Sequence, residues 1–348
     1  MKKFTLLMSI LLVSVMVLAA CQPAAAPTAA PAEPAAPAEP AVPAAPEVKK
    51  LRVAFVSPSN INDLAFTQSI SDAMKVLQAE MGADKLEYVY SENLFVVDDA
   101  AVALRDYASQ GFDIVIGHGS QYGASVQEIA KDFPNTTFAW GTAKDTSGIP
   151  NIYSYEAASD QGGYVFGVMA AKMTKSKVIG IIGPIETGDA KLYVDGFTAG
   201  VMSVDPTIQV LKTYTGSFSD VALASEAATT QIAAGADVLT GSAQMVVGAI
   251  GKATEAGIYW FGTQADQSSY APNTVVASQV YHWEVILRDI IAKRAAGTLG
   301  GESFNITLAN GGLGISVNPA IELSDEAKAA LTATVEGIVS GTITKTLP

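Results

Sequence analysis

The chain repeats one pattern of apolar segments and turns at a spacing of about 120 residues. Residues 111–117 and 235–241 each begin with Gly-x-Asp and continue as an apolar run, and residues 138–145 align with 259–266 around a shared Gly-Thr pair. Short apolar strands alternate with helix-length segments, which predicts an α/β fold with parallel sheets covered by helices on both faces. Because the repeat is far too long for a solenoid, we interpret it as two similar, Rossmann-like lobes.

The last part of the chain, residues 275–348, is too short for a third domain. It contains a strand, a helix, a glycine-rich passage and a final helix, expected at 275–280, 284–295, 309–314 and 324–339. We interpret these as segments that cross back between the lobes and form a hinge of several strands. Two lobes joined in this way make a cleft that can close around a small molecule. The predicted lobes comprise 49–157 with about 281–308, and 158–280 with about 309–348.

The N-terminus carries the pattern of an export signal. Two lysines precede an apolar run over residues 4–18, which is too short for a typical membrane-spanning helix. The run ends in Leu-Ala-Ala-Cys, which resembles the bacterial lipobox, so we predict a signal peptide over residues 1–20 and lipidation at Cys21. Residues 21–48 are almost wholly Ala, Pro and Glu, a composition typical of an extended tether. Lipid chains on Cys21 would hold the folded body at a membrane surface.

The charge and the histidines limit the functions that the chain can have. The net charge is −13 at pH 7, and no basic cluster follows the three cations at residues 49–52. This disfavours nucleic-acid binding, because phosphate contacts need a basic face. His118 and His282 stand apart and have no partner at the spacing of metal ligands. We therefore expect no catalytic residues, metal or cofactor, and keep a nucleoside-processing enzyme as an alternative.

The first strand and its loop provide the first candidate for ligand contact. Residues 51–69 read as strand, loop and helix. In parallel α/β sheets, ligands lie outside the carboxyl ends of the strands, which places the loop 57–66 where binding usually occurs. Phe66 is therefore a candidate ligand contact. The alternative is that its ring packs the first helix against the first strand.

Six short motifs between about residues 51 and 284 carry a family resemblance. They are Asn-Asp-Leu-Ala-Phe at 62–66, Gly-Gly-Tyr-Val-Phe-Gly-Val-Met-Ala-Ala at 162–171, Gly-Phe-Thr-Ala-Gly at 196–200, Tyr-Thr-Gly-Ser-Phe-Ser-Asp at 214–220, Gly-Ala-Asp-Val at 235–238 and Ala-Asp-Gln-Ser at 265–268. With the export signal and the two lobes, they make the chain resemble the basic membrane protein family of purine-nucleoside-binding lipoproteins, which are ABC importer substrate-binding proteins.

The resemblance implies a type I periplasmic-binding-protein fold with a multi-strand hinge. It also implies a purine nucleoside or base as ligand, an ABC permease as partner, and a lipid-anchored, extracytoplasmic location. We expect a monomer that has no enzymatic activity and does not bind nucleic acid. The alternative within the same fold is a binding protein for another small polar ligand, such as a sugar or an amino acid.

The resemblance also implies roles for particular residues. In that family two aromatic side chains hold the purine ring, and Phe66 and Phe218 occupy those positions here. Stacking of a base on an aromatic face is worth about 1–3 kcal/mol. Asp266 matches the acidic residue that binds ribose hydroxyls, a role that suits a carboxylate because it accepts hydrogen bonds. The alternative for Asp266 is a helix cap or a surface turn.

This chain departs from the family pattern on the sugar side of the expected pocket. Thr67 replaces a common asparagine, and the acidic residues expected near Ser57 and Gly141 are missing. A lysine that reaches the sugar is apparently replaced by Tyr281. These losses favour a free base over its nucleoside. The remaining candidate ligand contacts are polar or aromatic side chains near the predicted strand ends, namely Asp63, His118, Trp140 and Trp283.

Overall fold

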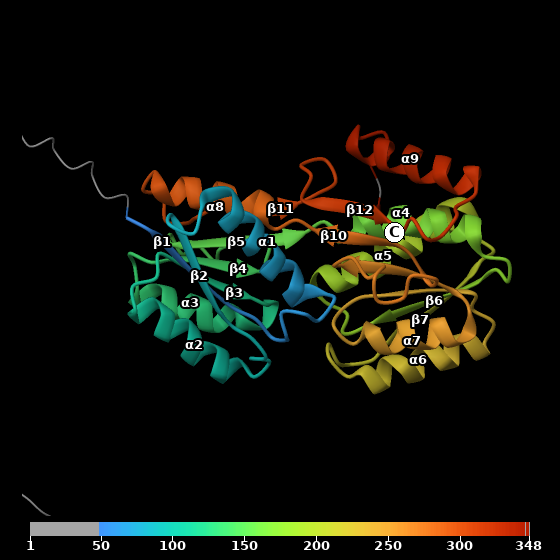
Figure 1. The fold of residues 1–348 in the computed structure, drawn as a ribbon, viewed down its shortest axis with the longest axis horizontal. Coiled ribbons are helices and arrows are strands. Elements are labelled where there is room, and N and C mark those ends of the chain that lie inside the picture. The colour runs from blue at the N-terminus through green and yellow to red at the C-terminus, as the bar shows by residue number, and fades with distance from the viewer. Residues whose placement is uncertain (1–48, 345, 348) are drawn as a thin grey trace, which may run out of the picture. The chain divides into compact units, whose positions relative to one another are not determined.

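The computed structural model describes residues 49–344, 346 and 347. These residues form two lobes, each built on a six-stranded sheet (Figure 1). The strand orders are β2-β1-β3-β4-β5-β11 and β7-β6-β8-β9-β10-β12, so equivalent strands occupy equivalent places. This confirms the predicted α/β fold of two Rossmann-like lobes. The predicted signal peptide 1–20, lipidation site Cys21 and tether 21–48 lie outside the described residues.

Lobe 1 combines the first strand-helix units of the chain with two later segments. Helices α1 and α8 cover one face of its sheet, and α2 and α3 cover the other. Because both faces are covered, β3 is buried along its whole length, as expected for a central parallel strand. The elements of lobe 1 are β1 (Leu51–Val56), α1 (Phe66–Met81), β2 (Leu86–Ser91), α2 (Val97–Ser109), β3 (Ile114–His118), η1 (Ser120–Tyr122), α3 (Gly123–Asp132), β4 (Thr137–Gly141), β5 (Ile152–Ala157), α8 (Glu284–Ala295) and β11 (Ser303–Ile306).

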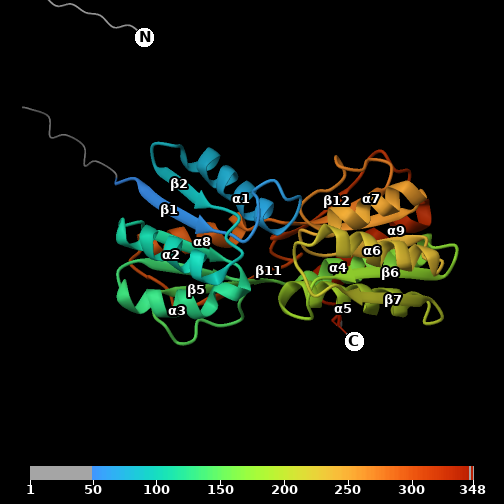
Figure 2. The same ribbon diagram turned by 90° about the horizontal axis from the view of Figure 1, so that it is seen from below.

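Lobe 2 repeats this arrangement. Helices α4, α5 and α9 cover one face of its sheet, and α6 and α7 lie side by side over the other (Figure 2). The elements of lobe 2 are α4 (Ser159–Met173), β6 (Val178–Gly183), α5 (Gly188–Val204), β7 (Gln209–Tyr214), α6 (Val221–Ala233), β8 (Val238–Gly241), α7 (Val246–Ala256), β9 (Tyr259–Gln264), β10 (Val275–Tyr281), β12 (Leu313–Val317) and α9 (Asp325–Val339). Across both lobes, no helix of the described residues is long and apolar enough to cross a membrane.

Three connections of the described chain join the lobes: β5 to α4, β10 to α8, and β11 to β12. The glycine-rich passage expected at 309–314 leads into a strand that the sequence did not indicate, β12. This strand pairs antiparallel with β10, whereas all other strand pairs of the described residues are parallel. The reason is that β10 runs from lobe 2 toward lobe 1, and β12 returns in the opposite direction.

Helices α4 and α5 pack closely because glycines lie on their shared face. A Cβ atom on Gly167 would collide with the carbonyl oxygen of Phe197, and a Cβ atom on Gly200 would collide with that of Tyr164. Substitution at such contacts overpacks a close-packed interface. Two of the motifs that carry the family resemblance therefore contribute to the packing of lobe 2.

Candidate ligand-binding site

A cavity lies between the lobes, at the carboxyl ends of the strands of both sheets. Its empty volume is about 410 Å³, a figure that includes space open to solvent. Lobe 1 contributes side chains that follow β1, β2, β3 and β4, among them Pro58, Phe66, Phe95, Gln121 and Thr142. Lobe 2 contributes side chains at or after the ends of β6, β7, β8 and β9, among them Asp189, Phe218, Ala243, Gln244 and Gln264.

Phe66 forms part of the lobe 1 wall and is held from behind by His118. It is the first residue of α1, is 8% exposed and lines the cavity. Its ring stacks on the imidazole of His118, with 3.9 Å between the ring centroids and 12° between the ring planes. Such contacts fix the orientation of an aromatic side chain. Phe66 is therefore a preformed flat surface in the cavity wall.

His118 is a neutral support for Phe66 and does not line the cavity. Its Nε2 lies 3.1 Å from the carbonyl oxygen of Phe66, which can only accept, so Nε2 carries the hydrogen. Its Nδ1 then accepts a hydrogen bond of 2.7 Å from the hydroxyl of Tyr155. Complete burial lowers the pKa of His118 to about 3, against a weaker opposite effect of the bond to Phe66. The imidazole is consequently uncharged at neutral pH.

Asp63 holds the start of α1 in place. Its carboxylate accepts hydrogen bonds from the backbone N–H groups of Ala65, Thr67 and Gln68, at 2.9, 3.1 and 3.0 Å. Free N–H groups at a helix start need such acceptors, and an acidic side chain also interacts favourably with the helix dipole there. Asp63, which was predicted as a ligand contact, does not line the cavity and instead positions Phe66 through the helix.

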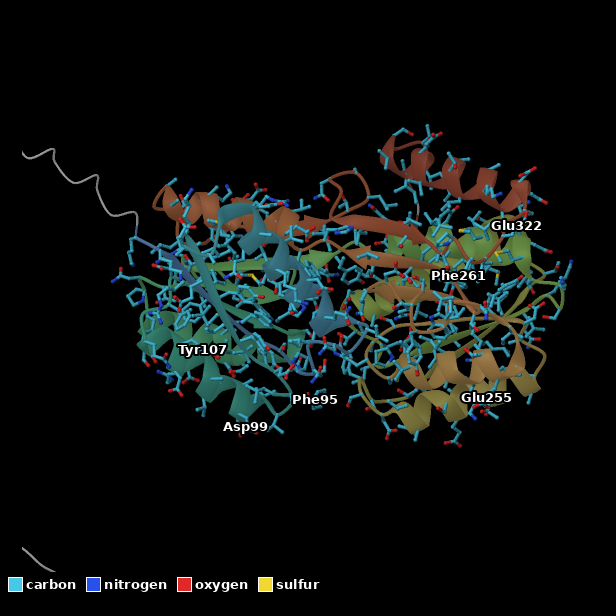
Figure 3. The ribbon with its side chains drawn as sticks, viewed as in Figure 1. Phe95, Asp99, Tyr107, Glu255, Phe261 and Glu322 are labelled. Atoms are coloured by element: carbon cyan, nitrogen blue, oxygen red, sulfur yellow. The ribbon has the colours of Figure 1, made fainter. Side chains whose placement is uncertain are left out.

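Aromatic rings line the cavity from both lobes. Phe218, half-buried in the loop between β7 and α6, lines it from lobe 2. A hydrogen bond of 3.0 Å from the N–H of Met245 to the carbonyl oxygen of Phe218 ties this loop to the start of α7. Phe95, in the loop between β2 and α2, is 50% exposed and lies at the lobe 1 edge that faces lobe 2 (Figure 3). Phe66 and Phe218, the two aromatic residues that the sequence predicts as ligand contacts, thus line one cavity.

Asp189 is the one charged side chain among the described residues that line the cavity. It lies in the first turn of α5 and is 8% exposed. Its Oδ2 accepts hydrogen bonds from Gln264 Nε2 at 3.3 Å and from the hydroxyl of Tyr281 at 3.1 Å. Burial raises the pKa of Asp189, although these bonds and the N–H groups of the helix start act to lower it. No ion pair of the described residues includes this carboxylate.

Two amide side chains of the lobe 2 wall have unused acceptors. The Oε1 atoms of Gln264 and Gln244 are buried and have no hydrogen-bond partner among the described residues. Gln264 ends β9 with a backbone φ of 75°, and Ala243 in the same wall has a φ of 82°. Non-glycine residues in this left-handed region are strained and are found often at functional sites. The wall is therefore polar, buried and incompletely bonded.

Asp266, predicted to bind ribose hydroxyls, does not line the cavity in this structure. Its side chain is exposed, and its carboxylate accepts hydrogen bonds from the N–H of Ser268 at 2.9 Å and from Ser316 Oγ at 2.7 Å. These bonds join the turn after β9 to β12. This geometry corresponds to the alternative of a surface turn.

Three further predicted contacts also lie outside the cavity wall. Ser57 and Thr67 are fully buried, and Thr67 Oγ1 is hydrogen-bonded to Ser59 Oγ at 2.7 Å. Trp140 packs against α3, where a Cβ atom on Gly123 would collide with its indole ring. These side chains support the strands and helices from which the cavity wall extends.

Tyr281 and Trp283 belong to a buried aromatic cluster in lobe 1. Tyr281 does not line the cavity, but its hydroxyl reaches Asp189 as described above. Trp283 is 0% exposed, and its Nε1 donates a hydrogen bond of 2.8 Å to Ser69 Oγ. Its ring makes edge contacts with Phe66, His118 and Tyr281. The two residues lie where β10 leads into α8 and contact Asp189 and Phe66, two residues of the cavity wall.

The sequence-based predictions include none of the polar residues that line the cavity. Asp189, Gln244 and Gln264 were not predicted, and neither were Thr142 and Phe95. A signal was present, because all five follow or end a strand whose carboxyl end faces the cleft.

Comparison with known proteins identifies the family. The family described as "ABC transporter substrate-binding protein PnrA-like" matches residues 50–345. A purine-binding protein of Brucella abortus is 30% identical over 235 residues, covering 68% of this chain and 66% of the relative. An ABC transporter nucleoside-binding protein, BmpA, of Lactococcus lactis is 28% identical over 317 residues, covering 83% of this chain and 88% of the relative. The chain thus spans about two thirds or more of these relatives.

Solved structures agree with the fold. An ABC transporter solute-binding protein from Aeropyrum pernix has a TM-score of 0.73 at 19% identity, over 84% of this chain and 92% of that one. Proteins of this kind bind a small molecule outside the cytoplasm, pass it to a membrane permease and catalyse no reaction. The family match includes both lobes, the hinge segments and every residue of the cavity wall. On this basis the chain belongs to the PnrA-like family of ABC transporter substrate-binding proteins.

Proposed function

We propose that this protein binds a purine base or purine nucleoside between its lobes and delivers it to an ABC permease. The observation that carries the proposal is that Phe66 and Phe218, from opposite lobes, line the same cavity. Purines have flat π faces, and stacking between two aromatic side chains is an effective way to hold them. The names of the two relatives, a purine-binding and a nucleoside-binding protein, support this ligand class.

We further propose that a free base binds at least as well as its nucleoside. Ribose gains affinity mainly through hydroxyl hydrogen bonds to fixed polar groups, and unpaired buried partners cost about 1–3 kcal/mol each. Within the described residues, Asp189 is the one charged side chain that lines the cavity, and Asp266 is turned to solvent. A nucleoside that binds a hundredfold more tightly than its base, with the advantage abolished in Asp266→Asn, would contradict this preference.

Replacing Phe218 with alanine tests the ligand class. We expect Phe218→Ala to weaken purine binding by about 5- to 150-fold, because one stacking contact worth about 1–3 kcal/mol is removed. Titration calorimetry with adenine, guanine, hypoxanthine, xanthine and their nucleosides measures the effect. Phe218 is half-buried in a loop, so its removal leaves the core intact.

The matched control is Tyr259→Ala. Tyr259 is a half-exposed aromatic residue at the start of β9, the end of that strand remote from the cavity, and its loss should leave affinity unchanged. If only sugars or amino acids bind to the wild-type protein, the purine proposal fails. The chain would then be a substrate-binding protein for another small polar ligand.

We also propose that a lipid on Cys21 anchors the protein to the membrane. The lipobox-like sequence before Cys21 and the Ala/Pro-rich segment after it support this. Expression of Cys21→Ala in a bacterial host is expected to release soluble protein whose ligand affinity equals that of the anchored form. Cys21→Ala protein that stays in the membrane fraction would show that another segment provides the anchor.

A further inference from the structure

The lobe 2 wall of the cavity contains two hydrogen-bond acceptors to which no side chain of the described residues donates. Asp189 uses Oδ2 to accept from Gln264 and Tyr281, and no side chain of the described residues donates to its Oδ1. Asp189 is more than nine-tenths buried, and a buried carboxylate without a basic partner is costly. A ligand that brings hydrogen-bond donors to this position would remove that cost.

Gln264 adds a second acceptor next to the first. Its Nε2 donates to Asp189, which settles the orientation of the amide and leaves Oε1 as the acceptor. This Oε1 is buried without a partner, and the side chain is 3% exposed. This hydrogen bond joins the amide group of Gln264 directly to the carboxylate of Asp189, so the two polar groups are neighbours in the cavity wall. The pair is therefore suited to two neighbouring donors on one edge of a ligand.

The contacts on the far side of the pair hold it in position. The hydroxyl of Ser159, in the first turn of α4, donates to the backbone carbonyl oxygen of Asp189 at 2.5 Å. The hydroxyl of Tyr281, at the end of β10, donates to the carboxylate. The strained backbone of Gln264 adds a local cost that tertiary contacts have to offset. Buried polar groups positioned in this way are preorganised for a ligand.

We propose that Asp189 and Gln264 select ligands that present two adjacent N–H donors, as a purine does when a 2-amino group stands beside a protonated N1. This inference rests on the proposed function and names the ligand edge that the same site would recognise. Guanine has this edge, whereas hypoxanthine keeps the N1–H and lacks the amino group. A guanidinium group has the same pair of donors, so guanidino compounds are a second class of ligand that this pair of side chains could bind.

The test compares ligands that differ by one amino group. Calorimetry on the full chain is carried out with the pairs guanine and hypoxanthine, and guanosine and inosine, and separately with arginine. We expect the wild-type protein to bind the amino-bearing member of each pair at least tenfold more tightly. Asp189→Asn should reduce that ratio to less than threefold, because the amide presents an N–H group or a single weaker acceptor to the donors.

Asp195→Asn is the matched control. Asp195 lies on the same helix, α5, is paired with Lys191 and does not line the cavity. This variant should therefore still bind guanine and guanosine at least tenfold more tightly than hypoxanthine and inosine. The thermal unfolding of unliganded Asp189→Asn separates lost recognition from lost folding. Because burial raises the pKa of Asp189, its neutral replacement is expected to keep or raise the unfolding midpoint at pH 7.5.

Each outcome decides a different question. Equal wild-type affinities within each pair, or an Asp189→Asn effect equal for both members, would overturn the donor selection and leave purine binding in place. Binding of arginine but of no purine would overturn the proposed function, and sensitivity of that binding to Asp189→Asn would still support the donor selection. A fall in the unfolding midpoint of Asp189→Asn by several degrees would show that this carboxylate is mainly structural and would overturn the inference.

Discussion

Acidification from neutral pH to pH 3 is expected to remove about 5 kcal/mol of folding free energy through His118 alone. Burial lowers the pKa of His118 to about 3, whereas the pKa of an exposed histidine is 6.5. Above pH 6.5 the imidazole is neutral in both the folded and the unfolded state, so it causes no pH dependence. Between pH 6.5 and 3 only the unfolded state takes up the proton, and stability falls. Below pH 3 both states are protonated and the loss is complete.

Urea unfolding of the wild-type protein and of His118→Gln between pH 7 and pH 3 measures this effect. At pH 7 the variant should be less stable, because it loses the stacking contact with Phe66. Its stability should then fall less steeply with acidification, since glutamine does not titrate and the carboxylates contribute equally to both proteins. Parallel stability curves over the whole range would show that His118 titrates normally and that its imidazole is accessible to protons.

Replacing Trp283 with alanine is expected to cost about 3–5 kcal/mol of folding free energy. The indole ring is fully buried and makes edge contacts with the rings of Phe66, His118, Tyr155 and Tyr281. Its Nε1 also donates a hydrogen bond to Ser69 Oγ, which the substitution removes. The substitution therefore opens a large cavity where α1, the sheet of lobe 1 and the hinge meet. Chemical denaturation of the unliganded protein at pH 7.5 measures the loss.

Trp283→Phe separates this structural role from a role in ligand contact. The variant keeps an aromatic ring and most of the buried volume, so it should lose less stability than the alanine variant. Since Trp283 does not line the cavity, the affinity of Trp283→Phe for purines should stay within about threefold of the wild-type value. A tenfold or larger loss of affinity with little loss of stability would show that the indole contacts the ligand after all.

The two-lobed architecture could be predicted because it is repeated locally in the sequence. Apolar runs such as 178–183 and 235–241 indicate buried parallel strands without knowledge of their neighbours, and β6 and β8 lie within them. Helices α4 and α6 show only weak helical periodicity of polar and apolar residues in the sequence. Helix α4 is apolar on nearly all sides because it packs against the sheet, α5 and α9, and α6 buries mainly alanines. A helix without a clear polar face lacks the periodicity by which sequence analysis finds helices.

The candidate site was only partly predictable, for a related reason. The position of an aromatic residue in a loop after a strand is a local property, and Phe66 and Phe218 follow from it. Which of several neighbouring polar residues faces the cleft is decided by how the loop turns. The chain turns after β9, where Gln264 has a φ of 75°; Gln264 lines the cavity, and Asp266, two residues later, is exposed.

The sequence by itself determined the number of lobes, most of their strands and the loops from which a ligand would be contacted. These features depend on residue patterns within short segments, and the same patterns occur in both halves of the sequence. Only the tertiary structure decided that Asp189, Gln264 and Tyr281 share hydrogen bonds, although 75 and 92 positions separate the last two from Asp189. Such contacts depend on the packing of three different elements against one another, and no local periodicity records that packing.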